Sequence, residues 1–267
     1  PVDEDALDLG GACVYPGFVD ANCHIGMWED GLGFAGSDGN EDTEPSTPHL
    51  RGLDAVNPLD RCFVEALEAG VTSVVTGPGS SNPVAGQLFA MKTYGRCIDD
   101  MIIKEPVAMK FALGENPKLS FHAHNQAPVT RMATAAIIRE QLYKAKRYLE
   151  DKQRASEDED TDEPEYDMRC EALIPLLNRE IPAHFHAHRA DDIFTAMRIA
   201  KEFSLDYTII HCTEGYLIAD ELKRAGAKAI VGPLICDRSK PELKNADSAN
   251  PGRMESAGIV TAICTDH

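Results

Sequence analysis

Four side chains that can bind a metal ion lie at the ends of, or directly after, short apolar runs of this sequence. They are His24, His186, His211 and Asp266, and a lysine, Lys110, lies inside a further apolar run. Imidazole nitrogen and carboxylate oxygen together suit zinc, iron or manganese. A single histidine in such a place is more often a core group satisfied by a backbone carbonyl. Packing does not explain the same placement after several different runs, so we expect one shared metal site.

The apolar runs alternate with amphipathic stretches, a pattern typical of repeated βα units around a parallel sheet. Eight runs are expected to be strands, and they cover residues 17–20, 71–76, 87–91, 107–113, 183–188, 207–211, 229–232 and 259–264. Between them, stretches such as 131–149 and 190–203 carry apolar residues at helical spacing. The sequence therefore predicts an α/β fold, a (β/α)8 TIM-type barrel of parallel strands. The carboxyl ends of such strands converge on the face where these barrels place their catalytic groups.

The 267 residues are enough for one such barrel, although two small domains would also fit. We expect residues 1–16 to be a remnant of a small β-sandwich domain and residues 17–267 to form the barrel. Residues 151–167 are strongly acidic and have no apolar periodicity, so they are predicted to be a flexible loop.

Composition excludes several classes of function. A formal net charge of −18 argues against nucleic acid as a partner, because that affinity comes largely from Lys and Arg. No run approaches the roughly 18 apolar residues of a membrane span, and the acidic first residues do not resemble a signal peptide. The eight cysteines are scattered singly, which favours reduced thiols and a cytoplasmic protein. A homo-oligomer is compatible with these data.

The first strand and its continuation, residues 16–26 (PGFVDANCHIG), resemble the opening of the amidohydrolase superfamily, normally written P-G-F-[IV]-D-x-H-x-H. The resemblance continues through residues 112–118, 186–192, 210–215 and 264–267. It covers nearly the whole chain and is strongest in the branch called imidazolonepropionase-like amidohydrolases. An ordered set of motifs is far more specific than a lone H-x-H.

The resemblance implies a role for each candidate side chain. His24 would be a ligand of a first metal, Lys110 a carbamylated (carboxylated) ligand bridging two metals, His186 and His211 ligands of the second metal, and Asp266 both ligand and general base. A protonated lysine cannot bind a cation, whereas its carbon dioxide adduct is a carboxylate that can. Lys92 is the alternative to Lys110, and a solvated charge or salt bridge is the ordinary role for either.

One position departs from the family pattern. Asn22 stands where the family has the first histidine of H-x-H, and an amide oxygen is a much weaker ligand for a borderline metal than imidazole. We therefore expect one or two ions, most simply zinc, with iron or manganese as alternatives, and a weakened site at Asn22 and His24. A second departure is that the helix and small-domain strands that usually follow the eighth strand in the family are missing from the given sequence, which ends at His267.

The predicted function is hydrolysis of an amide or cyclic amide C–N bond of a small molecule by a metal-activated water. His188, Arg189 and Glu214 are expected at the same mouth as substrate contacts, although Arg189 could equally pair with a neighbouring aspartate. A deaminase or lactonase on the same scaffold is the alternative. A catalytically impaired binding relative is a second alternative, because of Asn22.

Two other polar segments have simpler interpretations. Residues 76–83 follow the second strand and could present backbone N–H groups to an anionic group, although a plain turn is favoured. His122 and His124 form a second H-x-H pair in a polar stretch with no strand before it. We expect that pair on the surface.

Overall fold

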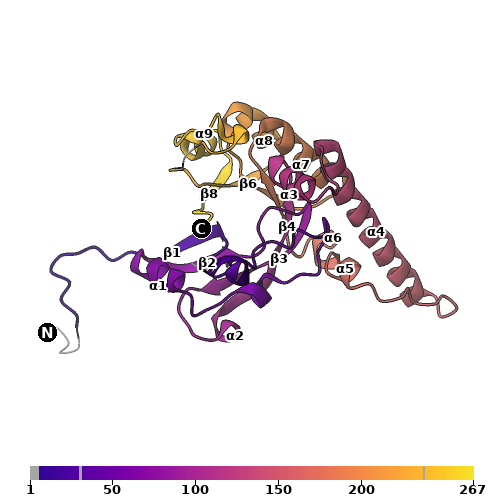
Figure 1. Cartoon of the computed structure of the whole chain (residues 1–267), viewed down its shortest axis with the longest axis horizontal. Coiled ribbons are helices and arrows are strands. Elements are labelled where there is room, and N and C mark those ends of the chain that lie inside the picture. Colours follow the sequence, from indigo (N-terminus) through magenta and orange to yellow (C-terminus); the bar gives the residue numbers. More distant parts are fainter. Residues whose placement is uncertain (1–5, 30–31, 237) are drawn as a thin grey trace.

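The computed structural model of the chain describes residues 6–29, 32–236 and 238–267. One sheet of eight strands runs in sequence order and curves into a barrel (Figure 1). The strands are β1 (Phe18–Cys23), β2 (Val71–Thr76), β3 (Val84–Lys92), β4 (Ile102–Ala112), β5 (Ala183–Ala187), β6 (Tyr207–His211), β7 (Lys228–Val231) and β8 (Val260–Ile263). Every expected strand is found, and the TIM-type barrel is confirmed.

The expectation that all eight strands are parallel is wrong for β3. β3 pairs antiparallel with both β2 and β4, whereas the other neighbouring pairs are parallel. The cause is the length of the connections. Residues 77–83 and 93–101, the second of which include the single turn α2 (Ile98–Met101), are too short for a crossover between parallel strands, which needs about a dozen residues or more, but they are long enough to reverse the chain.

Helices follow most of the parallel strands and cover the outside of the barrel. They are α1 (Arg61–Glu68), α2 (Ile98–Met101), α3 (Glu115–Ala123), α4 (Arg131–Glu157), α5 (Met168–Glu171), α6 (Ile174–Leu177), α7 (Ala190–Glu202), α8 (Ala219–Arg224) and α9 (Asn250–Ser256). The largest core cluster lies between these helices and β4 to β7. Among the residues described, none of the helices combines the length and apolar character that a membrane crossing requires.

Side chains of β4 and β5 point alternately to this core and to the barrel interior. Phe111 and Phe185 face the helices, and their rings stack with centroids 5.0 Å apart. Successive strand residues point to opposite faces. Lys110, His184 and His186 therefore point into the barrel, where Lys110 and His184 are direct partners in the register of the two strands.

The barrel is nearly closed between its first and last strands. β1 and β8 form no ladder, but bonds beyond the end of β8 join them: the N–H of Asp266 donates to the Asn22 carbonyl at 3.3 Å, and the N–H of His24 donates to the His267 carbonyl at 2.6 Å. The Asp20 carboxylate accepts from the N–H of Thr265 at 3.2 Å. These bonds place Asp266 against the end of β1.

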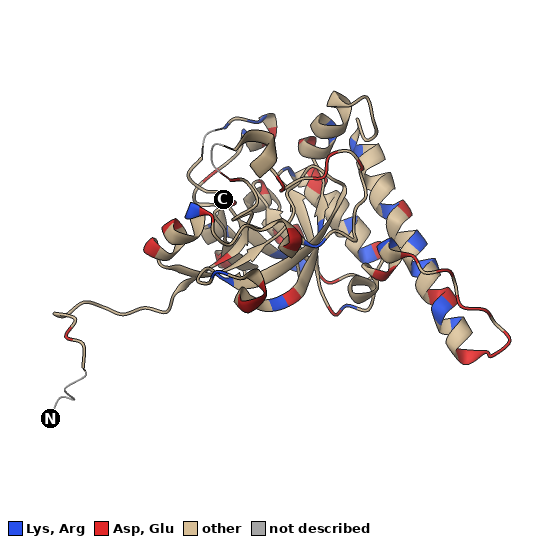
Figure 2. Ribbon diagram, turned by 60° about the horizontal axis from the view of Figure 1, so that its bottom comes forward, with Lys and Arg blue, Asp and Glu red and all other residues tan. Residues whose placement is uncertain are grey.

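The two segments expected outside the barrel are only partly as the sequence suggested. Residues 6–17 form neither helix nor strand and run away from the barrel, and their origin as a small-domain remnant stays a prediction. The prediction that residues 151–167 form a loop is wrong for residues 151–157, because α4 continues to Glu157. Its last turns mix good helix formers of both charges, and an acidic stretch follows (Figure 2). The helix-spaced apolar pattern fades there because this end projects from the barrel.

Candidate active site

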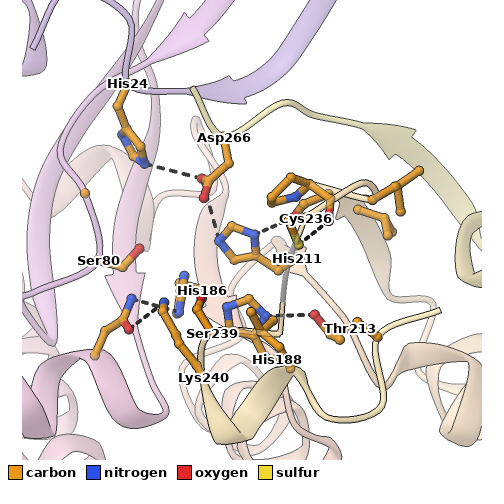
Figure 3. Close-up of a pocket in the computed structure, with 18 of the residues that line it drawn as sticks. His24, Ser80, His186, His188, His211, Thr213, Cys236, Ser239, Lys240 and Asp266 are labelled. Carbon is orange, nitrogen blue, oxygen red and sulfur yellow. Dashed lines mark hydrogen bonds and ion pairs between the residues drawn. The ribbon is translucent and has the colours of Figure 1, made fainter. Parts of the chain in front are cut away.

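A cavity of about 280 Å³ opens at the carboxyl ends of the parallel strands (Figure 3). His24 and Asp266 enter it from the two edges of the barrel, and His186, His188 and His211 enter from β5 and β6. The loop residues Asn40, Ser80 and Lys240 complete the wall, together with Asn116 in the first turn of α3. The structure thus brings four of the five residues expected at the metal site to one cavity.

Three buried histidines form a compact cluster in this cavity. His186, His188 and His211 each offer a ring nitrogen, and these atoms all lie within 4.8 Å of one another. Burial lowers the pKa of the His186 and His188 imidazoles well below the usual histidine value, and it lowers the pKa of His211 although Asp266 opposes this. Neutral imidazoles are the form that binds a metal. The cluster is a candidate metal site.

Backbone carbonyls orient two of the ligand candidates. Nδ1 of His24 lies 2.7 Å from the Gly77 carbonyl, and Nδ1 of His211 lies 2.6 Å from the Gly232 carbonyl. Each Nδ1 faces a carbonyl to which it can donate, and the opposite nitrogen, Nε2, is directed at Asp266. The Nε2 to Oδ1 distances are 3.5 Å for His24 and 3.8 Å for His211. Outer-shell bonds of this kind are typical of metal-binding histidines.

Backbone conformation also serves the site. Ile209 packs on the face of β6 that is turned to the helices. In a regular strand His211, two residues later, would lie on that same face and would point away from the cavity. A φ of +68° at His211 ends that regularity, and Asp266 has a φ of +59°. Non-glycine residues in this region are uncommon and often mark functional sites. Gly232 is required as well, because a Cβ there would lie 2.1 Å from the Cys264 carbonyl oxygen.

Asn22 is buried beside Asp266 and contacts it as a donor. Its Nδ2 lies 3.1 Å from Asp266 Oδ1, the same oxygen that faces His24 and His211. The amide therefore holds the carboxylate in place and presents its nitrogen, which is not a metal ligand, to this corner of the cavity. The weakened metal site at Asn22 and His24 stays a prediction.

Lys110 lies beneath the cavity and is fully buried. Its Nζ has no hydrogen-bond partner in the described part of the chain, and burial lowers its pKa. An unpaired buried ammonium is unfavourable, whereas a carbamate made from the neutral amine could be stabilised by a cation. Lys92, the alternative, lies at the far end of the barrel, where its Nζ donates to Ser73 Oγ at 3.1 Å. The antiparallel direction of β3 puts it there.

Of the three expected substrate contacts, only one lines the cavity. His188 lines the cavity but belongs to the histidine cluster, and its Nδ1 lies 2.7 Å from Thr213 Oγ1. Arg189 pairs with Asp191 through bonds of 3.0 and 2.8 Å and does not line the cavity. Glu214 does not line it either. Its carboxylate accepts from the N–H of Ala190 at 2.8 Å, at the start of α7, where negative charge is stabilised.

Sequence reasoning missed the loop between β7 and α9. Its short 3-10 helix, Pro241–Leu243, inserts the Glu242 carboxylate behind the histidines, and burial raises the pKa of Glu242 to about 7. Lys240 Nζ donates to Asn116 Oδ1 at 2.9 Å in the cavity wall. The segment follows no periodic pattern, so its polar residues resembled an ordinary surface loop.

The remaining polar segments behave as turns and surface. In the loop after β2, the N–H of Gly79 donates to the Gly39 carbonyl at 2.7 Å and that of Ser81 to Asn40 Oδ1 at 3.2 Å. These donors are used within the chain, which supports the plain-turn interpretation. His124 is exposed at the end of α3 and lies 3.6 Å from Asp42.

Comparison with known proteins agrees with the barrel and its histidine cluster. No family model matches the chain. It is 28% identical over 248 residues to "Amidohydrolase tasK" of Hapsidospora irregularis, covering 84% of this chain but only 25% of that much longer relative. The structure is similar to the crystal structure of an amidohydrolase from Thermotoga maritima MSB8, with a TM-score of 0.92, 41% identity, and coverage of 100% of this chain and 71% of that one. The chain belongs to the amidohydrolase family.

Proposed function

We propose that this protein is a metal-dependent amidohydrolase that cleaves an amide or cyclic amide C–N bond of a small molecule. The observation that carries the proposal is the buried cluster of His186, His188 and His211 facing the ionised carboxylate of Asp266 in one cavity. Family membership supports hydrolysis. The volume of the cavity, about 280 Å³, supports a small substrate.

The residues of the chain fit a divalent cation. His24 and His211 point their Nε2 atoms at one carboxylate oxygen, and the Lys110 amine below lacks a partner among the described residues. We propose zinc, with iron or manganese as alternatives, one or two ions, and a carboxylated Lys110. When bound, such an ion supplies Lewis-acid activation of water and of the scissile carbonyl.

Asp266 is proposed as the proton acceptor. Although burial alone would raise the pKa of Asp266, His211 and His24 hold it below its usual value, so the carboxylate is ionised. Asn22 donates to Oδ1 and keeps the group aimed into the cavity. Asp266 can then take a proton from water and deliver it to the leaving nitrogen. Lys240, Asn40 and Ser80 line the wall and are proposed to contact the substrate.

A screen of metal-loaded protein tests the proposal. The panel contains N-acyl amino acids, dipeptides, imidazolones and lactones, with His211→Ala as the matched control. Turnover of an amide that disappears in the control supports the function, and imidazolone turnover would also support the proposed imidazolonepropionase-like branch. Turnover of lactones alone would replace it with lactonase activity. No turnover of any compound by zinc-, iron- or manganese-loaded protein would contradict hydrolysis and favour a binding role. The cytoplasmic setting stays a prediction.

A further inference from the structure

Glu242 is a buried carboxylate that the hydrolytic machinery described above does not use. Its side chain is 0% exposed, and its Oε2 accepts from the N–H of Glu115 at 3.1 Å. Gly114, with a φ of +84°, leaves room for that oxygen, since a Cβ there would lie 2.8 Å from it. The carboxylate is therefore held in one orientation by the start of α3.

The second oxygen of Glu242 is directed at two histidines. Oε1 has no hydrogen-bond partner among the described residues and lies 3.6 Å from His188 Nε2 and 4.0 Å from His186 Nε2. Two atoms bound to one ion at about 2.0–2.2 Å each can be no more than about 4.4 Å apart. Both distances satisfy this limit. Thr213, which engages His188 Nδ1, aims the opposite nitrogen of that ring at Glu242.

The two carboxylates of the cavity divide the histidines between them. Asp266 faces His24 and His211, whereas Glu242 faces His186 and His188. The cavity therefore has two places where imidazole nitrogens meet a carboxylate oxygen. Burial of an oxygen without a donor is unfavourable, and a cation between Oε1 and the two imidazoles would relieve it.

We propose that His186, His188 and Glu242 form a divalent-metal site of their own, distinct from the position between His24, His211 and Asp266. The proposal goes beyond the proposed function, because hydrolysis assisted at Asp266 needs no ligand from the loop between β7 and α9. It makes His188 a ligand and not a substrate contact. An ion bound there would also fasten that loop to the end of β5.

Calorimetric titration of the full chain with zinc, and the visible absorption of the cobalt-loaded protein, test this site. The variants are Glu242→Gln, Asp266→Asn and the control Asp192→Asn, which alters a buried carboxylate that pairs with Arg131 at 3.0 Å and faces no histidine. We expect Glu242→Gln to lose one binding event or to weaken it at least about tenfold, and to change the cobalt spectrum. Asp192→Asn should bind like the parent, and Asp266→Asn should keep the event that Glu242→Gln loses.

Unchanged zinc stoichiometry and affinity in Glu242→Gln, with the parent cobalt spectrum, would overturn the proposal. Because this change keeps the shape of a buried side chain that forms no ion pair with a lysine or arginine in the described part of the chain, we expect the variant to fold; far-ultraviolet circular dichroism checks it. If it does not fold, His188→Gln gives the same readout from the other side of the site. Absence of any hydrolytic turnover would remove the proposed function but leave these binding results unaffected, so the two failures are distinguishable.

Discussion

Replacing Asn22 by histidine restores the family's H-x-H pair and should lower the stability of the metal-free protein while it increases the stabilisation that zinc provides. In the metal-free protein the change removes the bond from Asn22 Nδ2 to Asp266 Oδ1, which is 3.1 Å long and charge-assisted. Bonds to charged groups contribute about 1.5–3 kcal/mol, so Asn22→His should be less stable than the parent by about that amount.

Zinc binding adds a contribution of the opposite sign. The new imidazole adds a nitrogen ligand beside His24 and Asp266, and a tenfold gain in affinity equals about 1.4 kcal/mol. At a free zinc concentration 100 times the dissociation constant, binding stabilises the folded state by about 2.7 kcal/mol. Asn22→His should therefore gain more stability from zinc than the parent does, and it should bind more zinc per chain.

Differential scanning calorimetry with and without zinc, together with elemental analysis, measures both effects. The control is Asn22→Ala, which loses the bond to Asp266 and adds no ligand; it should be destabilised without any added response to zinc. An equal zinc response in the parent, Asn22→His and Asn22→Ala would refute the reasoning. So would two tightly bound ions per chain in Glu242→Gln, which lacks the further site proposed above, because Asn22 would then not weaken the site beside His24.

Three further outcomes are expected. Phe185→Ala should lower the free energy of unfolding by about 3–5 kcal/mol in urea denaturation, because the ring is fully buried and stacked on Phe111; a loss below about 1 kcal/mol would mean that the core closes around the gap. Hydrogen bonding to Lys144 lowers the pKa of Asp167 to about 2, so the stability that this carboxylate contributes is complete above the unfolded pKa of about 3.9 and is lost as the pH falls through about 2. Asp167→Ala should therefore lower the free energy of unfolding by about 1–2 kcal/mol at pH 7 and by less in strong acid. An equal loss at both pH values would contradict this prediction. Lys110→Met should abolish the carbonyl signal that ¹³C-bicarbonate introduces into the metal-loaded parent, and absence of that signal in the parent would exclude the carboxylated lysine.

Strand positions could be read from the sequence because apolar, β-rich runs are a local signal. The pairing direction of β3 was not read correctly, although the short connections on both sides carried the information. The alternating order of strands and helices in the rest of the chain favours parallel strands, whereas the short connections on both sides of β3 favour chain reversal. The extent of α4 was underestimated because its last turns pack against little, and helix formation there depends on residue propensity and not on an apolar face.

Some residues of the candidate site could likewise be predicted from the sequence, and others could not. His24, His186, His211 and Asp266 were found because each follows a strand, and the barrel brings strand ends together. Glu242 was missed because only the tertiary path of its loop carries it behind the histidines. Sequence proximity to the histidines also misplaced Arg189 and Glu214. Their side chains turn to Asp191 and to the start of α7, where local charge and helix polarity hold them.

The metal content of the purified chain tests the central claim most directly. After equilibration with zinc and removal of unbound metal, elemental analysis should find at least about one zinc per chain in the parent, and His211→Ala should retain much less. Arg189→Ala, which changes a side chain outside the cavity, should match the parent. A parent that retains no zinc, iron or manganese, or a His211→Ala variant that retains as much as the parent, would contradict the account.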